Sequence, residues 1–120
     1  MSENTRAYPN VETPDVLYTN YDNYSLGAGL SVVVELVVEN DFRTVGFTVY
    51  TATENVRIQI DESFAVPGAA PIWRTIEDIT LGAGNTFDAI YRKTRGSYQI
   101  AVTNLGLAAT LIDLGTTKGY

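Results

Sequence analysis

Two adjacent pairs of carboxylates, Asp61-Glu62 and Glu77-Asp78, are the residues of this 120-residue chain best suited to acid–base chemistry. A glycosidase needs two carboxyl groups that face each other across a groove. Neighbouring residues of a strand point to opposite faces of a sheet, so neither pair forms such a dyad by itself. A calcium loop is not indicated either, because the chain has no Asp-x-Asp-x-Asp sequence. We interpret the four carboxylates as solvated groups near strand ends.

The chain contains no histidine and no cysteine. This excludes disulfides, thiolate catalysis, the usual zinc and haem sites and every catalytic triad that needs an imidazole. Gly27-Ala28-Gly29 and Gly82-Ala83-Gly84 lack both the third glycine of a dinucleotide fingerprint and the Lys-Ser/Thr of a Walker loop. We interpret them as turns in which glycine supplies a positive φ. We therefore expect no catalytic residue, cofactor or metal site, and a protein that is not an enzyme.

The charge balance narrows the range of partners. Asp and Glu number 14 against 8 Lys and Arg, giving a formal net charge of −6. Such a surface repels polyanions, so we expect no binding to nucleic acid and none to anionic membranes. The longest apolar run, residues 32–38, is interrupted by Glu35 and is too short to span a bilayer. The first residues have no apolar stretch behind a basic start, so we expect synthesis in the cytoplasm.

The first 24 residues differ from the rest of the chain. They are polar and contain Pro9 and Pro14, which disfavour a helix. Tyr18, Tyr21 and Tyr24 recur every third residue, which is the period of polyproline II. A first strand is the alternative for residues 16–25, and the pattern leaves both open. We predict an extended N-terminal arm over residues 1–24 and a folded domain over residues 25–120.

From residue 30 onward, apolar and polar residues alternate with the period of a strand. Asn40-Asp41 indicates a hairpin turn between the first two of these segments. Trp73, Ile76 and Ile79 have helical spacing, but the β-branched residues around them favour a strand with a bulge. We expect residues 115–120 to be frayed. The expected strands cover residues 30–39, 43–51, 55–61, 72–81, 86–91, 97–103 and 107–114. Short strands separated by Gly and Asn turns predict an all-β fold, a single jelly-roll-like β-sandwich.

The segment 30–39 carries more aliphatic side chains than one buried face requires. Its outward face still shows Val33 and Val37 between carboxylates, where a solvated strand should be polar. With Phe42 these valines would form an apolar patch that the arm or another subunit covers. The predicted assembly interface therefore consists of Tyr18, Tyr21, Tyr24, Val33, Val37 and Phe42.

Trp73 is the only tryptophan of the chain. Its apolar neighbours favour a place in the core. Exposed on a sheet, it would instead stack on a sugar ring and serve as the platform of a glycan-binding site.

Residues 55–104 resemble a recurrent jelly-roll pattern. The resemblance rests on the strand 56–61, on Trp73, on Leu-Gly-Ala-Gly at residues 81–84 and on the segment 96–104. Modules of this appearance occur in discoidin-type glycan and surface binders and in the decoration, or cement, proteins of tailed-phage capsids. The resemblance to capsid decoration proteins implies a non-enzymatic structural protein of the virion that forms homo-oligomers or docks on a major capsid or other virion protein. The resemblance to discoidin-type binders implies, as the alternative, a carbohydrate-binding module for host or glycan attachment.

Overall fold

The computed structural model describes residues 16–36, 43–64, 69–92 and 97–119. Over these residues the chain forms eight strands and no helix, so it has no helical segment capable of crossing a membrane. The strands are β1 (Val16–Leu26), β2 (Ser31–Leu36), β3 (Thr44–Thr51), β4 (Val56–Ser63), β5 (Trp73–Leu81), β6 (Thr86–Arg92), β7 (Ser97–Asn104) and β8 (Thr110–Gly119).

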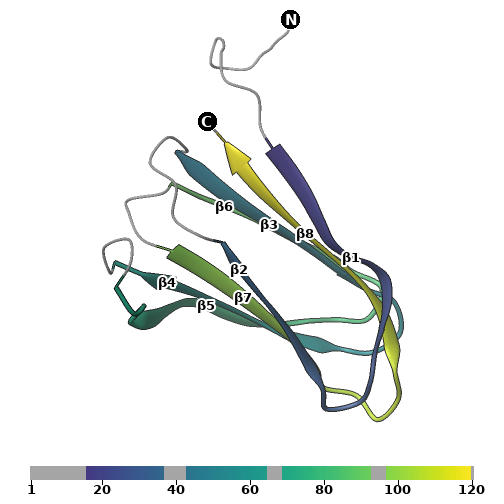
Figure 1. The fold of residues 1–120 in the computed structure, drawn as a ribbon. Helices are drawn as coiled ribbons and strands as arrows, with labels where there is room; N and C mark the ends of the chain where they lie inside the picture. Colours follow the sequence, from purple (N-terminus) through teal and green to yellow (C-terminus); the bar gives the residue numbers. More distant parts are fainter. Residues whose placement is uncertain (1–15, 37–42, 65–68, 93–96, 120) are drawn as a thin grey trace, which may run out of the picture.

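The strands form two antiparallel sheets that face each other (Figure 1). Sheet A has the order β1-β8-β3-β6 and sheet B the order β2-β7-β4-β5. Only β4 and β5 follow each other within one sheet; every other connection takes the chain from one sheet to the other. This is the strand order of a jelly roll, which confirms the predicted all-β sandwich.

The core lies between the sheets and follows the alternation seen in the sequence. On β3, β4 and β7 the buried apolar side chains occupy every second position, on the faces that the pattern predicted, although Asp61, Glu62 and Ser63 at the end of β4 are buried as well. The apolar side chains are Val45, Phe47, Val49, Val56, Ile58, Ile60, Tyr98, Ile100 and Val102.

The predicted hairpin at Asn40-Asp41 is wrong. Strand β2 pairs with β7 in sheet B, whereas β3 pairs with β6 and β8 in sheet A. Residues 37–42, which include Val37 and Phe42 of the predicted interface, lie outside the described residues. A turn-forming dipeptide predicts that the chain changes direction, but it does not predict which sheet the next strand joins.

The predicted fraying of the C-terminal residues is also wrong. Strand β8 begins at Thr110, three residues later than expected, and continues to Gly119 between β1 and β3. Thr116 and Lys118 are buried there. The polar composition of this segment hid the strand, because its stability comes from pairing with two neighbours and not from apolar alternation.

The N-terminal boundary differs from the prediction as well. Strand β1 begins at Val16 and pairs with β8, so residues 16–24 are part of sheet A and the strand alternative holds for this segment. The register shifts between Thr19 and Tyr21 and again between Tyr21 and Tyr24. These irregularities bring the two tyrosine rings together edge to face, with centroids 4.9 Å apart, although an odd number of positions, three, would place them on opposite faces of a regular strand. Residues 1–15 of the predicted arm lie outside the described residues.

Strand β5 contains the predicted bulge. Ile60 pairs with Glu77 and Asp61 with Thr75, so Ile76 is the extra residue. The bulge allows Ile76 to pack against the core while Glu77 faces the opposite sheet. Glu77 there accepts a hydrogen bond of 3.0 Å from the Tyr91 hydroxyl of β6. This contact joins β5, an edge strand of sheet B, to β6, an edge strand of sheet A.

Replacing Tyr91 with phenylalanine removes the donor that Glu77 uses in this contact. We expect a loss of about 1 kcal/mol in the free energy of unfolding, measured by urea denaturation at neutral pH. Tyr50→Phe on β3, which leaves the contact between the sheets intact, is the matched control.

The same variant tests a pH dependence. Burial, reinforced by the hydrogen bond to Glu77, raises the pKa of Tyr91 well above its ordinary value. The unfolded chain ionises this phenol above about pH 10, whereas the folded chain keeps it protonated. Its contribution to stability is therefore complete below about pH 10 and declines as the pH rises further. Between about pH 9 and pH 11 the wild-type chain should lose more stability than Tyr91→Phe; equal losses would contradict the assignment.

Candidate functional site

Four connections between strands meet at one end of the sandwich, at the lower right of Figure 1, and we call this the loop end. They comprise residues 27–30, 52–55, 82–85 and 105–109. Backbone hydrogen bonds tie them together: Gly29 N–H donates to the Asn104 carbonyl, Leu105 N–H to Asn55 and Gly84 N–H to Thr51. The loop end is therefore a fixed surface and not a set of independent loops.

Two of these connections are the repeated Leu-Gly-Ala-Gly corners. Gly29 and Gly84 have φ of 75° and 80°, a region that favours glycine. In each corner an N–H closes a turn on the first glycine carbonyl, from Leu30 at 3.1 Å and from Asn85 at 3.2 Å. This confirms the interpretation of both segments as turns. One corner takes the chain from sheet A to sheet B and the other from sheet B to sheet A.

Asn104 positions the connection between β7 and β8. Its side chain is 1% exposed, and its amide donates to the carbonyls of Leu26 at 2.9 Å and Ala108 at 2.8 Å. Its Oδ1 accepts the Gly106 N–H at 2.8 Å. One buried side chain thus satisfies three backbone groups and fixes the shape of the loop.

This loop, Leu-Gly-Leu-Ala-Ala at residues 105–109, has no polar side chain. Leu107 is 99% exposed and Leu105 is 50% exposed, while Leu30 of the neighbouring corner is 60% exposed. We call these three residues the leucine tip. Large apolar side chains held in water on a fixed loop are typical of an interaction surface.

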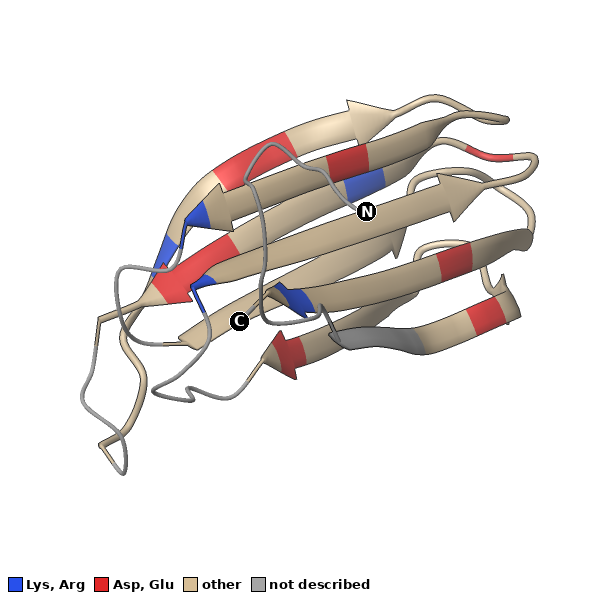
Figure 2. Cartoon of the chain, turned by 90° about the horizontal axis from the view of Figure 1, so that it is seen from above, with Lys and Arg blue, Asp and Glu red and all other residues tan. Residues whose placement is uncertain are grey.

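The leucine tip was not predicted from the sequence, because residues 107–114 were interpreted as a strand. The available signal was the lack of any polar residue between Asn104 and Thr110, which is unusual for a surface turn. The four connections of the loop end carry a single charged residue, Glu54. Figure 2 shows Lys and Arg in blue on the strands or next to them, and none of the four connections contains either residue.

The described residues of the predicted interface lie on strands β1 and β2. Val33 is 56% exposed on the outward face of β2, and Tyr24 is exposed at the edge strand β1. Tyr21 packs against the core of its own sandwich. Tyr18 lies in β1 opposite Thr116 of β8. That these residues take part in assembly stays a prediction.

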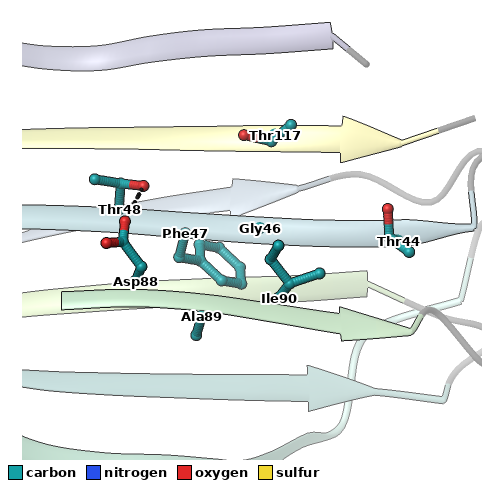
Figure 3. Close-up of a pocket in the computed structure, with 8 residues that line it drawn as sticks. All are labelled: Thr44, Gly46, Phe47, Thr48, Asp88, Ala89, Ile90 and Thr117. Atoms are coloured by element: carbon teal, nitrogen blue, oxygen red, sulfur yellow. Dashed lines mark hydrogen bonds between the residues drawn. The ribbon is translucent and has the colours of Figure 1, made fainter. Parts of the chain in front are cut away.

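The outward face of sheet A carries a hollow of about 340 Å³ (Figure 3). Gly46 of β3 forms its floor, because it lies in register between Ile90 of β6 and Thr117 of β8 and has no side chain. Ile90 is 79% exposed at the rim. Thr48 donates a 2.8 Å hydrogen bond to Asp88, the one charged residue of the lining.

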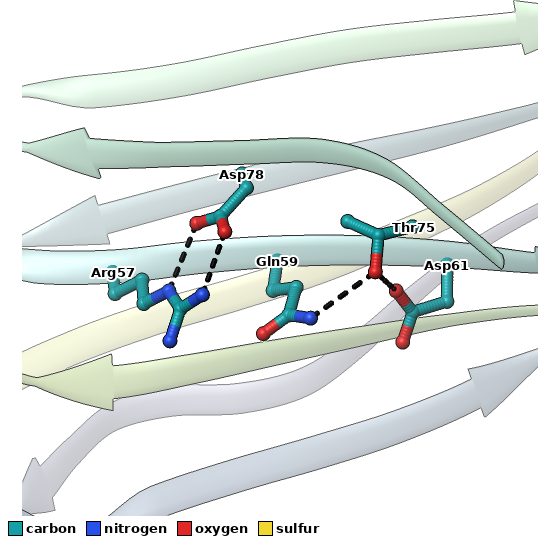
Figure 4. Close-up of polar contacts among 5 residues, drawn as sticks. All are labelled: Arg57, Gln59, Asp61, Thr75 and Asp78. Carbon is teal, nitrogen blue, oxygen red and sulfur yellow. Dashed lines mark hydrogen bonds and ion pairs between the residues drawn. The ribbon is translucent and has the colours of Figure 1, made fainter. Parts of the chain in front are cut away.

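The outward face of sheet B carries a row of polar side chains that bind one another (Figure 4). Arg57 donates two hydrogen bonds to Asp78, at 2.8 Å and 2.6 Å, and these lower the pKa of Asp78. Asp61 accepts hydrogen bonds from Thr75 at 2.7 Å and from Gln99 at 2.9 Å. Trp73 is half-buried, and as the second residue before Thr75 it shares this outward face.

The two carboxylate pairs separate as strand geometry requires. Asp61 belongs to the outward row, whereas Glu62 forms an ion pair with Arg74. Both side chains are buried, so the interpretation as solvated groups is wrong for this pair. Glu77 binds Tyr91 between the sheets, whereas Asp78 binds Arg57 on the outside. Among the residues that the structure describes, no group of three acidic side chains is placed to hold a metal ion.

No protein-family model and no curated protein matches this sequence. Solved structures share the fold. The PBSX exported protein XepA matches 87% of this chain with a TM-score of 0.66 and 17% identity, and the chain spans 37% of its length. The Yersinia pseudotuberculosis-derived mitogen YPM matches 91% of this chain and 88% of its own, with a TM-score of 0.53 and 12% identity. A chain of the IBDV viral particle matches 89% of this chain and 31% of its own, with a TM-score of 0.50 and 11% identity. At these identities the likeness shows the fold alone.

Replacing Asn104 with alanine should destabilise the protein strongly, because it leaves the buried carbonyl of Leu26 and the part-buried Ala108 carbonyl and Gly106 N–H without their partner. We expect a loss of about 3 kcal/mol in the free energy of unfolding, measured by urea denaturation. Asn85→Ala is the matched control. Its amide also bonds two carbonyls of a corner, but at an exposed position where water replaces it, so the loss should stay near 0.5 kcal/mol. Similar losses for the two variants would show that burial of Asn104 is not what fixes the loop.

Proposed function

We propose that this chain is a non-enzymatic structural protein that self-associates or docks on a larger protein assembly, and that this assembly is a virion, with the chain as a capsid decoration protein. The single observation that carries the proposal is the leucine tip. Two leucines are held in water by a hydrogen-bonded loop that has no polar side chain, a third is exposed on the neighbouring corner, and a partner surface would remove all three from solvent.

The virion assignment draws support from the proteins that share the fold. One is described as a PBSX exported protein and another belongs to the IBDV viral particle. A jelly roll also serves unrelated functions, so this support is an analogy of fold. The surface of this chain adds a physical argument, because its net charge of −6 favours a protein partner over nucleic acid.

The residues of this chain give little support to a catalytic role. It has no histidine or cysteine, and its two adjacent carboxylate pairs divide between different faces and partners. We therefore propose that the protein acts by binding and not by catalysis.

The assembly proposal predicts a native mass above 13.1 kDa, or a stable place in purified particles. Sedimentation velocity over a concentration series measures the first, and mass spectrometry of washed virions from the source culture measures the second. A chain that is monomeric at every concentration and absent from the particles would overturn the proposal.

The N-terminal residues are tested by a truncation that starts at Val16. A truncation at Ser25 would remove most of β1 and its pairing with β8, so it cannot separate assembly from folding. The chain 16–120 should keep the wild-type circular dichroism spectrum. If residues 1–15 bind a neighbouring subunit, this truncation should lower the oligomer mass or the particle occupancy; unchanged values would remove the arm from the proposal.

Glycan binding is the second candidate, and one observation favours it. Trp73 keeps part of its surface exposed on the same face as a row of amide, carboxylate and hydroxyl groups, a combination that suits a sugar ring. Titration with a panel of oligosaccharides should then shift the fluorescence of Trp73, and Trp73→Ala should abolish binding by calorimetry. A constant emission spectrum across the panel would count against this candidate.

A further inference from the structure

We propose that the hollow at Gly46, on the outward face of sheet A, binds a neutral sugar residue. Trp73 belongs to the other sheet, so this position is separate from the one considered for the second candidate function. The inference is also independent of the assembly proposal, and it adds a sugar-binding position that neither of them includes.

Gly46 is a glycine that the fold does not require. It lies within β3 and pairs in unbroken register with Ile90 of β6 and Thr117 of β8, so it marks no bulge. Its φ lies outside the left-handed region. A Cβ at this position would lie 3.5 Å from Thr117, and 3.6 Å from Ile90 and from the Ala89 carbonyl oxygen, which are ordinary van der Waals contacts.

Glycine in the interior of a strand has a cost. It loses more conformational freedom on folding than any other residue and has no side chain to pack. Where no bulge, positive φ or close contact within the fold demands a glycine, the close approach of a ligand or of another chain is a reason for its presence. We therefore attribute the missing side chain of Gly46 to an occupant of the hollow, and the lining indicates its chemistry.

The lining combines hydroxyl groups with one apolar wall (Figure 3). Thr44 and Thr48 lie on either side of Gly46 on the same face of β3, roughly 14 Å apart along the strand. Thr117 of β8 adds a third hydroxyl, and each hydroxyl can donate one hydrogen bond and accept others. Ile90 is 79% exposed and forms the apolar wall. A sugar ring is complementary to this lining, because it carries hydroxyl groups around its edge and C–H groups on its faces.

The charge of the hollow favours a neutral ligand. Among the described residues that line it, Asp88 is the only charged one. An anionic ligand would meet this carboxylate on a protein whose net charge is −6. Thr48 donates a hydrogen bond of 2.8 Å to Asp88 and thereby orients the carboxylate. A carboxylate has several acceptor positions, so Asp88 can also accept hydrogen bonds from sugar hydroxyls.

The hollow has room for a single sugar residue. Its volume is about 340 Å³, at the lower end of the roughly 300–1,000 Å³ range of pockets that bind small molecules. Thr48, Asp88 and Ile90 are exposed, so the rest of a longer glycan can extend into solvent. Because one ring on an outward sheet face buries little surface, we expect dissociation constants in the millimolar range.

The experiment is an NMR titration of the isotope-labelled full chain with the methyl glycosides of glucose, galactose, mannose and N-acetylglucosamine. At least one glycoside should shift the amide signals of Gly46, Asp88 and Thr117 along a saturable curve. Gly46→Val fills the hollow with a side chain that suits a strand, and Asp88→Ala removes the carboxylate. Each change should weaken this binding at least about tenfold.

Gly46→Ala separates a binding role from a structural one. The added methyl group fits the fold, so the midpoint of urea unfolding should stay the same or rise while sugar binding weakens. A fall in stability would show that the fold requires the glycine, and it would overturn the inference. Ala101→Val is the matched control, because it adds bulk at a half-buried position of the central strand β7 in sheet B and should leave the titration unchanged.

The outcomes separate this inference from the proposed function. If no glycoside shifts the amide signals around Gly46, the inference is overturned, while sedimentation still decides the assembly proposal. If Trp73→Ala abolishes the sugar response and Gly46→Val does not, the glycan site lies on sheet B and only the second candidate function stands. If butylamine saturates the hollow and no glycoside does, Asp88 binds a cation and the inference is overturned.

Discussion

The chain crosses between its two sheets at almost every connection, and each crossing leaves backbone amides and carbonyls that must find partners away from the strand ladders. At the loop end these partners are buried side chains. Asn104 serves the connection between β7 and β8, and Thr51 and Thr110 serve the connection between β3 and β4. The rest of the sandwich depends on this requirement, because a core between two sheets exists only if the crossings are satisfied.

The same hydrogen bonds explain why leucines stand in water. A loop free to rearrange would turn Leu105 and Leu107 toward the nearest apolar surface. Asn104 prevents this by bonding Gly106 and Ala108, so the exposure of these leucines is built into the folded state. The two outward faces differ in kind. Sheet B presents polar side chains that bind one another, whereas sheet A presents a hollow where Gly46 has no side chain.

The alternation of apolar and polar residues located the strands well, because the period of two is a local property that survives in any sheet. The segment at Ile76 also followed the sequence, since β-branched residues and an irregular spacing together indicated a strand with a bulge. The failures share one cause. The hairpin at Asn40-Asp41, the frayed tail and the arm ending at Tyr24 all required knowledge of which strand pairs with which.

By itself the sequence determined an all-β sandwich, its core faces and the two glycine corners, because each of these depends on residues close together in the chain. The absence of histidine and cysteine also excludes any chemistry that depends on an imidazole or a thiol of this chain. Only the tertiary structure decided that β8 lies between β1 and β3, that Asn104 is buried and that Leu107 projects into solvent. Those features depend on contacts between residues far apart in the chain, such as Asn104 with Leu26, and no local pattern encodes them.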